Sequence, residues 1–270
     1  MPKNPAQRSE DGIIVTPDFI AVIDGSTSKS QRRCHRLPLT ARRSTSNGEL
    51  AMLTVAATIK TMPAATTCHQ FCHAATLALR RRYVKSLLPH LAQHPEDRLT
   101  ASAIVFSRLH RQLWLVGDCQ CLVDGLHFDN PKPYEEQLAR QRADLIRSVT
   151  GRQPTVADAD AARQAIIPHM LQAMQQQNKT YSVLDGFPVA MNHVQTVTLS
   201  LQPHQLVLAT DGYPFLLPTL DRSEALLQQQ LSEDPLNIGP RFMATKALMP
   251  GYNSFDDRAY IRFDIYSKRH

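Results

Sequence analysis

The sequence has little of what marks a membrane protein, a disulfide scaffold or a nucleic-acid groove. It has five cysteines among 270 residues, an odd number without a disulfide framework, and this usage fits a reducing compartment. No apolar run approaches the length that crosses a bilayer, and the first residues lack the apolar core of a signal peptide. We therefore expect a cytoplasmic protein without membrane contact.

Positive charge is in modest excess, with a net charge of +6, but it is not gathered into one long tract. Two local clusters, at 29–43 and 80–82, carry much of the excess. Aromatic residues are only 6% of the chain, and no stacking platform accompanies these clusters, so we expect no nucleic-acid partner. The first cluster fits equally a solvated loop and a loop that faces phosphate or an acidic substrate surface.

The clearest local pattern is an apolar strand that ends in an acid and a glycine. Residues 19–23 are apolar and rich in β-branched side chains, and Asp24 and Gly25 follow directly. A carboxylate at the end of a buried strand costs free energy unless a partner compensates its charge, and a metal ion is a common partner. Gly25 lets the backbone turn sharply and brings its carbonyl close to whatever Asp24 holds.

Two later stretches repeat this design. Asp211-Gly212 follows the strand expected at 206–210, and Asp256 comes just before the alternating strand at 259–265. Asp-Gly is also a common turn dipeptide, which is the simpler interpretation of any single pair. If the acids converge, a site rich in carboxylates suits Mg²⁺ or Mn²⁺. Two such ions can position and ionise a water for attack on phosphorus.

The remaining patterns predict strands and helices that build two β-layers with helices outside. We expect one domain spanning 1–270, with a long basic loop at 26–47 and a helical insert at about 132–178. The expected helices outside the insert begin near 47, run over 67–88 and cover 222–231, and the expected strands include 101–107, 112–117 and 194–201.

Seven short motifs occur in order along nearly the whole chain. They are Ser9-Glu10-Asp11, Phe19 to Gly25, Gly48-Glu49-Leu50-Ala51, Thr100-Ala101-Ser102-Ala103, Gly117-Asp118-Cys119-Gln120, Thr210-Asp211-Gly212 and Ser254-Phe255-Asp256-Asp257. In this order they resemble the metal-dependent serine/threonine protein phosphatase family, type 2C. The resemblance implies an α+β fold, a four-layer α-β-β-α sandwich of two antiparallel sheets flanked by helices, with a two-metal site at one end.

The resemblance also implies roles for the matched acids. Asp24 would bridge two Mg²⁺ or Mn²⁺ ions, and Asp11, with Glu10 nearby, would orient a metal-bound water, so Asp11 and Asp24 would be the catalytic pair. The implied metal ligands are Asp24, the Gly25 carbonyl, Asp211 and Asp256, with Asp118 matching an acid of a weaker third ion.

Several positions depart from the family pattern. The family commonly follows its Asp-Gly with a histidine, its proposed general acid, but Ser26-Thr27-Ser28 stands here, which leaves a water or His35 to protonate the leaving group. Phe215 stands where the family has a further acid. Arg8 is near, though not at, the place of the family's phosphate-binding arginine, and we take Arg8 and Lys29 as candidates for phosphate binding.

These observations predict a phosphatase that hydrolyses phosphomonoesters, with phosphoserine or phosphothreonine on a protein as the substrate. The missing histidine keeps open a catalytically weak relative that binds a phosphoprotein or regulator. The run from Asp24 to Lys29 also resembles the phosphate loop of actin-like sugar kinases, but it is one residue short. No glycine-rich adenosine-binding motif follows it, and the whole chain has only ten glycines.

Another pattern, Cys68-His69 followed by Cys72-His73, has metal-ligand residue types at helical spacing. On a helix these residues could hold zinc, but no second pair occurs at a suitable spacing. We therefore expect a half-buried helix face there.

Overall fold

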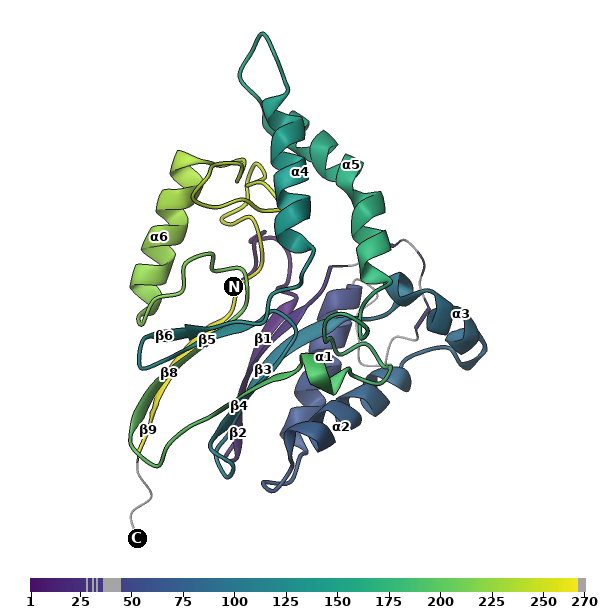
Figure 1. The fold of residues 1–270 in the computed structure, drawn as a ribbon, viewed down its shortest axis with the longest axis vertical. Helices are drawn as coiled ribbons and strands as arrows, with labels where there is room; N and C mark the ends of the chain where they lie inside the picture. Colours follow the sequence, from purple (N-terminus) through teal and green to yellow (C-terminus); the bar gives the residue numbers. More distant parts are fainter. Residues whose placement is uncertain (28, 31, 33, 36–44, 267–270) are drawn as a thin grey trace.

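Two antiparallel β-sheets face one another in the computed structural model, which describes all residues except 28, 31, 33, 36–44 and 267–270 (Figure 1). The first sheet has the order β1-β2-β3-β4-β7, and the second has the order β6-β5-β8-β9. Most of the predicted basic loop at 26–47 falls outside the described residues.

The first sheet contains β1 (Asp11–Val15), β2 (Phe19–Gly25), β3 (Ala101–Ser107), β4 (Gln112–Val116) and β7 (Gln195–Thr198). The second contains β5 (Gln120–Val123), β6 (Leu126–Phe128), β8 (His204–Ala209) and β9 (Tyr260–Ile265). The helices are α1 (Asn47–Lys60), α2 (Cys68–Arg80), α3 (Leu88–Gln93), α4 (Glu135–Arg147), α5 (Val156–Met174) and α6 (Leu220–Glu233). Short 3-10 turns are η1 (Lys85–Leu87), η2 (Pro95–Asp97) and η3 (Met191–His193).

Strand β2 is buried on both faces, which explains its nearly continuous apolar sequence. Ile20 and Val22 point between the sheets, where they belong to the same apolar cluster as residues of β5 and β8. Phe19, Ala21 and Ile23 point the other way, against α1 and α2. The strand that carries Asp24 is therefore held rigidly at the centre of the molecule.

Helices complete the outer layers. Helices α1 and α2 cover the outer face of the first sheet, where they enclose Trp114 with Phe19 and Phe71. Helix α6 packs through Leu227 and Leu231 on the second sheet. The predicted α+β arrangement of helix, sheet, sheet and helix is thus confirmed. Helices α4 and α5, within the segment predicted as helical at 132–178, project from one end of the sandwich (Figure 1).

The single helix predicted over 67–88 is wrong. Helix α2 ends at Arg80, and the chain then turns through η1 into α3. Tyr83 accounts for the break, because its hydroxyl donates to the Asp185 carbonyl at 2.6 Å and accepts from the Leu99 amide at 2.9 Å. The tertiary hydrogen bonds of this buried tyrosine outweigh local helix propensity. None of the described helices is long and apolar enough to cross a membrane.

Candidate metal centre

Strand pairing brings the predicted acids together at one end of the sandwich. In the register of β1 with β2, Asp11 lies opposite Asp24, and in that of β2 with β3, Asp24 lies opposite Ser102. Asp211 follows the end of β8, and Asp118 precedes β5, which is the neighbour of β8. Carboxylate oxygens of Asp24, Asp118 and Asp211 all lie within 4.8 Å of one another.

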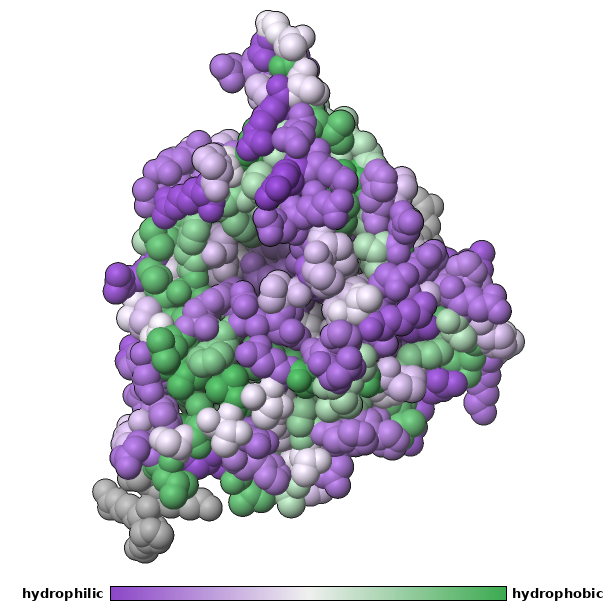
Figure 2. Space-filling view, viewed as in Figure 1, coloured by the Kyte–Doolittle hydropathy of each residue, from purple (hydrophilic) through white to green (hydrophobic). Residues whose placement is uncertain are grey.

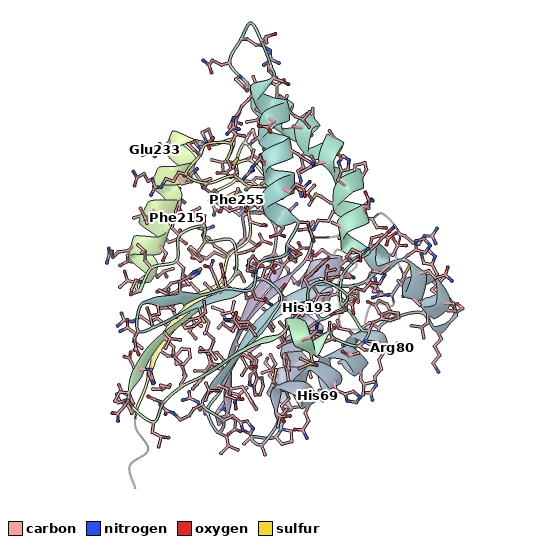
Figure 3. All side chains as sticks on the ribbon, in the orientation of Figure 1. His69, Arg80, His193, Phe215, Glu233 and Phe255 are labelled. Atoms are coloured by element: carbon pink, nitrogen blue, oxygen red, sulfur yellow. The ribbon has the colours of Figure 1, made fainter. Side chains whose placement is uncertain are left out.

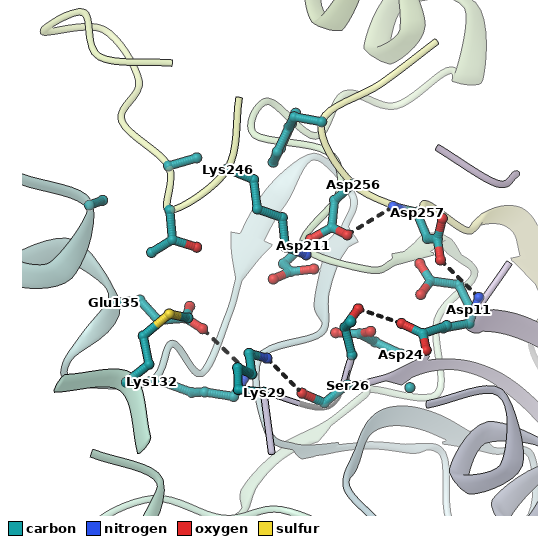
Figure 4. Close-up of a pocket in the computed structure, with 18 of the residues that line it drawn as sticks. Asp11, Asp24, Ser26, Lys29, Lys132, Glu135, Asp211, Lys246, Asp256 and Asp257 are labelled. Atoms are coloured by element: carbon teal, nitrogen blue, oxygen red, sulfur yellow. Dashed lines mark hydrogen bonds and ion pairs between the residues drawn. The ribbon is translucent and has the colours of Figure 1, made fainter. Parts of the chain in front are cut away.

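Most of the predicted acids line one cavity, but Asp118 is not among its lining residues (Figure 4). Asp11, Asp24, Gly25, Asp211 and Asp256 all line it, so the structure gathers most of the residues predicted for the site. Helices α4 and α5 and the segment 242–246 complete the wall. Figure 2 shows a hollow in the visible face of the molecule below α4.

The glycines after Asp24 and Asp211 permit close backbone contacts. The turn interpretation is wrong for Asp24-Gly25, because both residues belong to β2. It holds for Asp211-Gly212, which form a turn in which the Tyr213 amide donates to the Thr210 carbonyl at 3.5 Å. A Cβ on Gly25 would lie 2.1 Å from the Gly48 carbonyl oxygen, and one on Gly212 would lie 2.0 Å from the Asp257 carbonyl oxygen. Any side chain at either position would displace the backbone that frames the acids.

Glu10 ties three segments of this frame together. The Ser46 hydroxyl, at the N-cap of α1, donates to one carboxylate oxygen of Glu10 at 2.5 Å, and the Thr27 hydroxyl donates to the other. The Glu10 amide donates to the Asp257 carboxylate at 2.9 Å. Glu10 therefore holds the segment after β2 against α1, and both of its side-chain oxygens are engaged.

Asp24 and Asp211 are strongly perturbed. Burial raises the pKa of Asp24 well above its usual value, and the charges of Asp11 and Asp118 raise it further. Burial also raises the pKa of Asp211, with Asp24 and Asp118 adding to it. Burial also raises the pKa of Asp11. Its buried Oδ2 has no hydrogen-bond partner among the described residues. A cation fits this group, since it would relieve the repulsion and supply the missing partner.

Three lysines that the sequence analysis did not single out neutralise the other acids. Lys132 pairs with Asp118, whose second oxygen accepts from the Ser102 hydroxyl at 2.5 Å. Lys246 and Lys3 both pair with Asp256, the latter at 3.1 Å. Lys3 and Asp256 are 253 residues apart, and the other two pairs, 14 and 10 residues apart, follow no helical or strand period, so no local pattern indicates them.

The lysines reverse the effect of burial on the acids they touch. Burial would raise the pKa of Asp118, but the ammonium group of Lys132 outweighs it and lowers that pKa. Burial is likewise outweighed at Asp256, whose pKa is lowered by Lys246 and Lys3. The centre thus contains compensated and uncompensated carboxylates side by side.

The two candidate phosphate ligands lie differently. Lys29 lines the cavity, where its ammonium donates to the Ser26 hydroxyl at 3.2 Å, and burial and then the nearby charges of Lys246 and Lys132 lower the Lys29 pKa to about 8. Arg8 is half-exposed, does not line the cavity, and donates to Glu49 at 2.6 Å. The structure therefore brings Lys29, but not Arg8, to the acids.

The other residues raised by the sequence lie outside the centre. His35 does not line the cavity, and its backbone forms an isolated antiparallel β-bridge with that of Tyr83. Phe215 packs on Phe242 with 6.2 Å between ring centroids. His69 lies on α2, across the molecule from Phe255, which lines the cavity (Figure 3). Among the described residues, the four residues Cys68, His69, Cys72 and His73 form no group of three metal ligands, in line with the expected helix face.

Solved structures similar to this chain include a bacterial serine phosphatase and serine/threonine phosphatases. A bacterial serine phosphatase is 13% identical, with a TM-score of 0.47, over 99% of this chain and 96% of that chain. The PstP/Ppp phosphatase of Mycobacterium tuberculosis is 13% identical, with a TM-score of 0.41, over 98% and 95% of the two chains. The PstP catalytic domain, solved with two manganese ions, is 13% identical, with a TM-score of 0.39, over 82% and 78%.

No family model matches the sequence, and no curated protein is similar to it.

Proposed function

We propose that this protein is a metal-dependent phosphatase that hydrolyses phosphomonoesters, with phosphoserine or phosphothreonine on a protein as its substrate. The observation that carries the proposal is a set of carboxylates with no ion-pair partner among the described residues, the buried Asp11 and the partly exposed Asp24 and Asp211, in a cavity that also contains Lys29. Unpaired acids crowded into one cavity repel one another, so they favour a cation-binding role.

The donor set indicates which cation belongs there. All candidate ligands are oxygens, namely the carboxylates of Asp24 and Asp211 and the carbonyl of Gly25, which suits Mg²⁺ or Mn²⁺. Two ions fit the proposal if the second ion replaces Lys3 and Lys246 as the partner of Asp256. When bound, the ions supply a strongly nucleophilic water and neutralise charge at phosphorus.

The chain's own residues would do the remaining work. The unpartnered Oδ2 of Asp11 can accept a hydrogen bond from the attacking water and hold it in line with the scissile bond. Lys29 can bind the phosphate, because its ammonium group donates to the Ser26 hydroxyl, a neutral partner that leaves the lysine charge uncompensated at that contact. Lys132 holds Asp118 in place beside Asp24.

The test is hydrolysis of p-nitrophenyl phosphate and of a phosphothreonine peptide, with Mn²⁺ or with a chelator, by the wild type and by Asp211→Asn. Asp264→Asn is the matched control, because Asp264 is an exposed aspartate on β9, away from the cavity. We expect metal-dependent turnover in the wild type and the control, and a large loss in Asp211→Asn. Equal turnover with and without metal, or in all three proteins, would refute the proposal.

A second candidate is a weakly catalytic protein that binds a phosphoprotein. The ion pairs of Lys132 with Asp118 and of Lys246 with Asp256 favour it, because they already neutralise two acids of the centre. It predicts Mn²⁺ binding by calorimetry and phosphopeptide binding, with no hydrolysis of either substrate. An ATP-dependent kinase would instead show a nucleotide-dependent thermal shift, which we do not expect.

A further inference from the structure

A second group of metal-ligating side chains lies where the segment after β2 meets α3. A Cys34 sulfur, a His90 ring nitrogen and an Asp97 carboxylate oxygen all lie within 4.8 Å of one another. None of the three residues lines the cavity of the acids. We propose that this cluster, named here the Cys34 site, binds a thiophilic divalent cation, for which Zn²⁺ is the best fit.

The ligand types select the metal. A thiolate and an imidazole suit Zn²⁺ and disfavour Mg²⁺ and Mn²⁺, which prefer oxygen ligands. The Cys34 site therefore differs in chemistry from the carboxylate centre, and the two would not compete for the same ion. Three protein ligands leave a fourth, tetrahedral position for water or a nearby side chain.

His94 lies next to His90 but does not supply the fourth ligand. The two imidazole rings stack with centroids 4.2 Å apart, and His94 Nδ1 lies 3.1 Å from Glu96 Oε1. A metal ion lies in the plane of each imidazole that binds it, so two stacked rings do not share one ion, and the fourth position is left to water. The sequence analysis overlooked this group, because Cys34 joins it from a distant part of the chain.

The three ligands are held in place before any ion binds. The carbonyl of Cys34 accepts from the Val84 amide at 3.1 Å, and the Cys34 side chain is buried. His90 Nε2 lies 2.6 Å from Asp97 Oδ2, while the hydroxyl of Ser30 donates to the other oxygen of Asp97. The residues therefore arrive from three segments with their backbones already fixed.

One charge opposes a cation at the Cys34 site. A guanidinium nitrogen of Arg32 lies 3.2 Å from His90 Nε2, and Nε of Arg32 lies 3.9 Å from Asp97. The Arg32 side chain is 58% exposed, so it can turn into solvent when an ion enters. Without an ion, the same contacts form an ordinary hydrogen-bonded cluster, and this is the alternative that the experiment has to exclude.

Zinc here would fix the chain close to the acid centre. Cys34 follows Lys29 by five residues, and Lys29 stands in the cavity. An ion at the Cys34 site would therefore tie the chain to α3 and η2 at a point five residues after Lys29. The inference does not depend on the proposed phosphatase activity, because metal binding at the Cys34 site is measured directly.

The experiment uses Co²⁺ as a spectroscopic substitute for Zn²⁺ in the full chain. The protein is freed of metal with a chelator, titrated with Co²⁺, and followed by the near-ultraviolet thiolate-to-cobalt absorption. Among the described residues no cysteine lines the carboxylate cavity, so that centre cannot produce a thiolate-to-cobalt band. We expect one Co²⁺ per chain to give the band, and Zn²⁺ to abolish it by displacement.

The matched variants are Cys34→Ser and Cys72→Ser, since Cys72 is also buried in the same apolar cluster but lies outside the Cys34 site. Cys34→Ser should lose the band, and Cys72→Ser should keep it. His90→Ala should weaken Zn²⁺ binding by more than about 100-fold, beyond the effect of losing a residue that only supports a ligand. His90→Ala also tests the proposal by itself if Cys34→Ser fails to fold.

Absence of the band in the wild type, or its persistence in Cys34→Ser, would overturn the proposal. Zn²⁺ affinity unchanged in His90→Ala would overturn it as well. Failure of the proposed phosphatase activity would appear separately, as absent turnover with Mn²⁺ and an unchanged cobalt spectrum.

Discussion

Without metal ions, Asp211→Asn should be more stable than the wild type. Carboxylate oxygens of Asp24 and Asp211 lie within 4.8 Å, and two unit charges at that distance repel by about 3 kcal/mol at an effective dielectric constant of about 20. Partial protonation reduces this cost in the wild type. Asparagine has nearly the shape of aspartate, so we expect a gain of about 1–3 kcal/mol in the free energy of unfolding.

With Mn²⁺ the order should reverse, because binding to the folded state stabilises the wild type and the variant lacks one ligand. The assay is urea unfolding of the wild type, Asp211→Asn and the Asp264→Asn control near neutral pH, in chelator and in Mn²⁺. The control should follow the wild type in both. If Asp211→Asn were less stable than the wild type in chelator, the carboxylates would not be repelling one another and the reasoning would be wrong.

Three further predictions concern pH, phosphate and the core. The raised folded-state pKa values of Asp24 and Asp211 make their contribution to metal-free stability most favourable at low pH, and that contribution is lost as pH rises through them. In chelator the wild type should therefore lose stability relative to Asp211→Asn as pH rises, while apparent Mn²⁺ affinity rises; a pH-independent stability difference in urea unfolding, or a flat affinity profile in calorimetry, would contradict this. Lys29→Met should raise KM several-fold in steady-state kinetics, because the phosphate loses a cationic partner. Since the Lys29 pKa is about 8, the wild-type KM should rise above that pH, whereas the KM of Lys29→Arg should stay level. Arg98→Met should lower the free energy of unfolding in urea by about 3–5 kcal/mol, because the fully buried Asp185 loses its ion-pair partner, and it should leave Mn²⁺ affinity unchanged. A loss of less than about 1 kcal/mol would contradict this.

Local sequence was enough to predict where the acids meet. Asp24 and Asp211 each end an apolar strand, and strands packed in two sheets deliver such ends to a shared edge. The same reasoning missed why glycine follows them. Gly25 and Gly212 are explained by backbone approaching from Gly48 and Asp257, which only the assembled fold contains.

The charges that surround the acids could not be predicted. Lys3 and Asp256 are 253 residues apart in the sequence, and no periodicity joins them. The predicted helix over 67–88 failed for a related reason, because its break depends on Tyr83 bonding to distant carbonyls. Pairs of this kind are selected by tertiary packing, and they decide which acids remain without a partner.

The unequal compensation of the carboxylates has a consequence for how the protein would respond to metal supply. A first ion would enter between Asp24 and Asp211 without displacing a lysine from either, whereas a second would have to displace Lys246 or Lys3 from Asp256. Loading would then proceed in two steps of different affinity. A cell poor in manganese or magnesium would hold a half-loaded form, so that the concentration of free metal itself sets the fraction of competent protein.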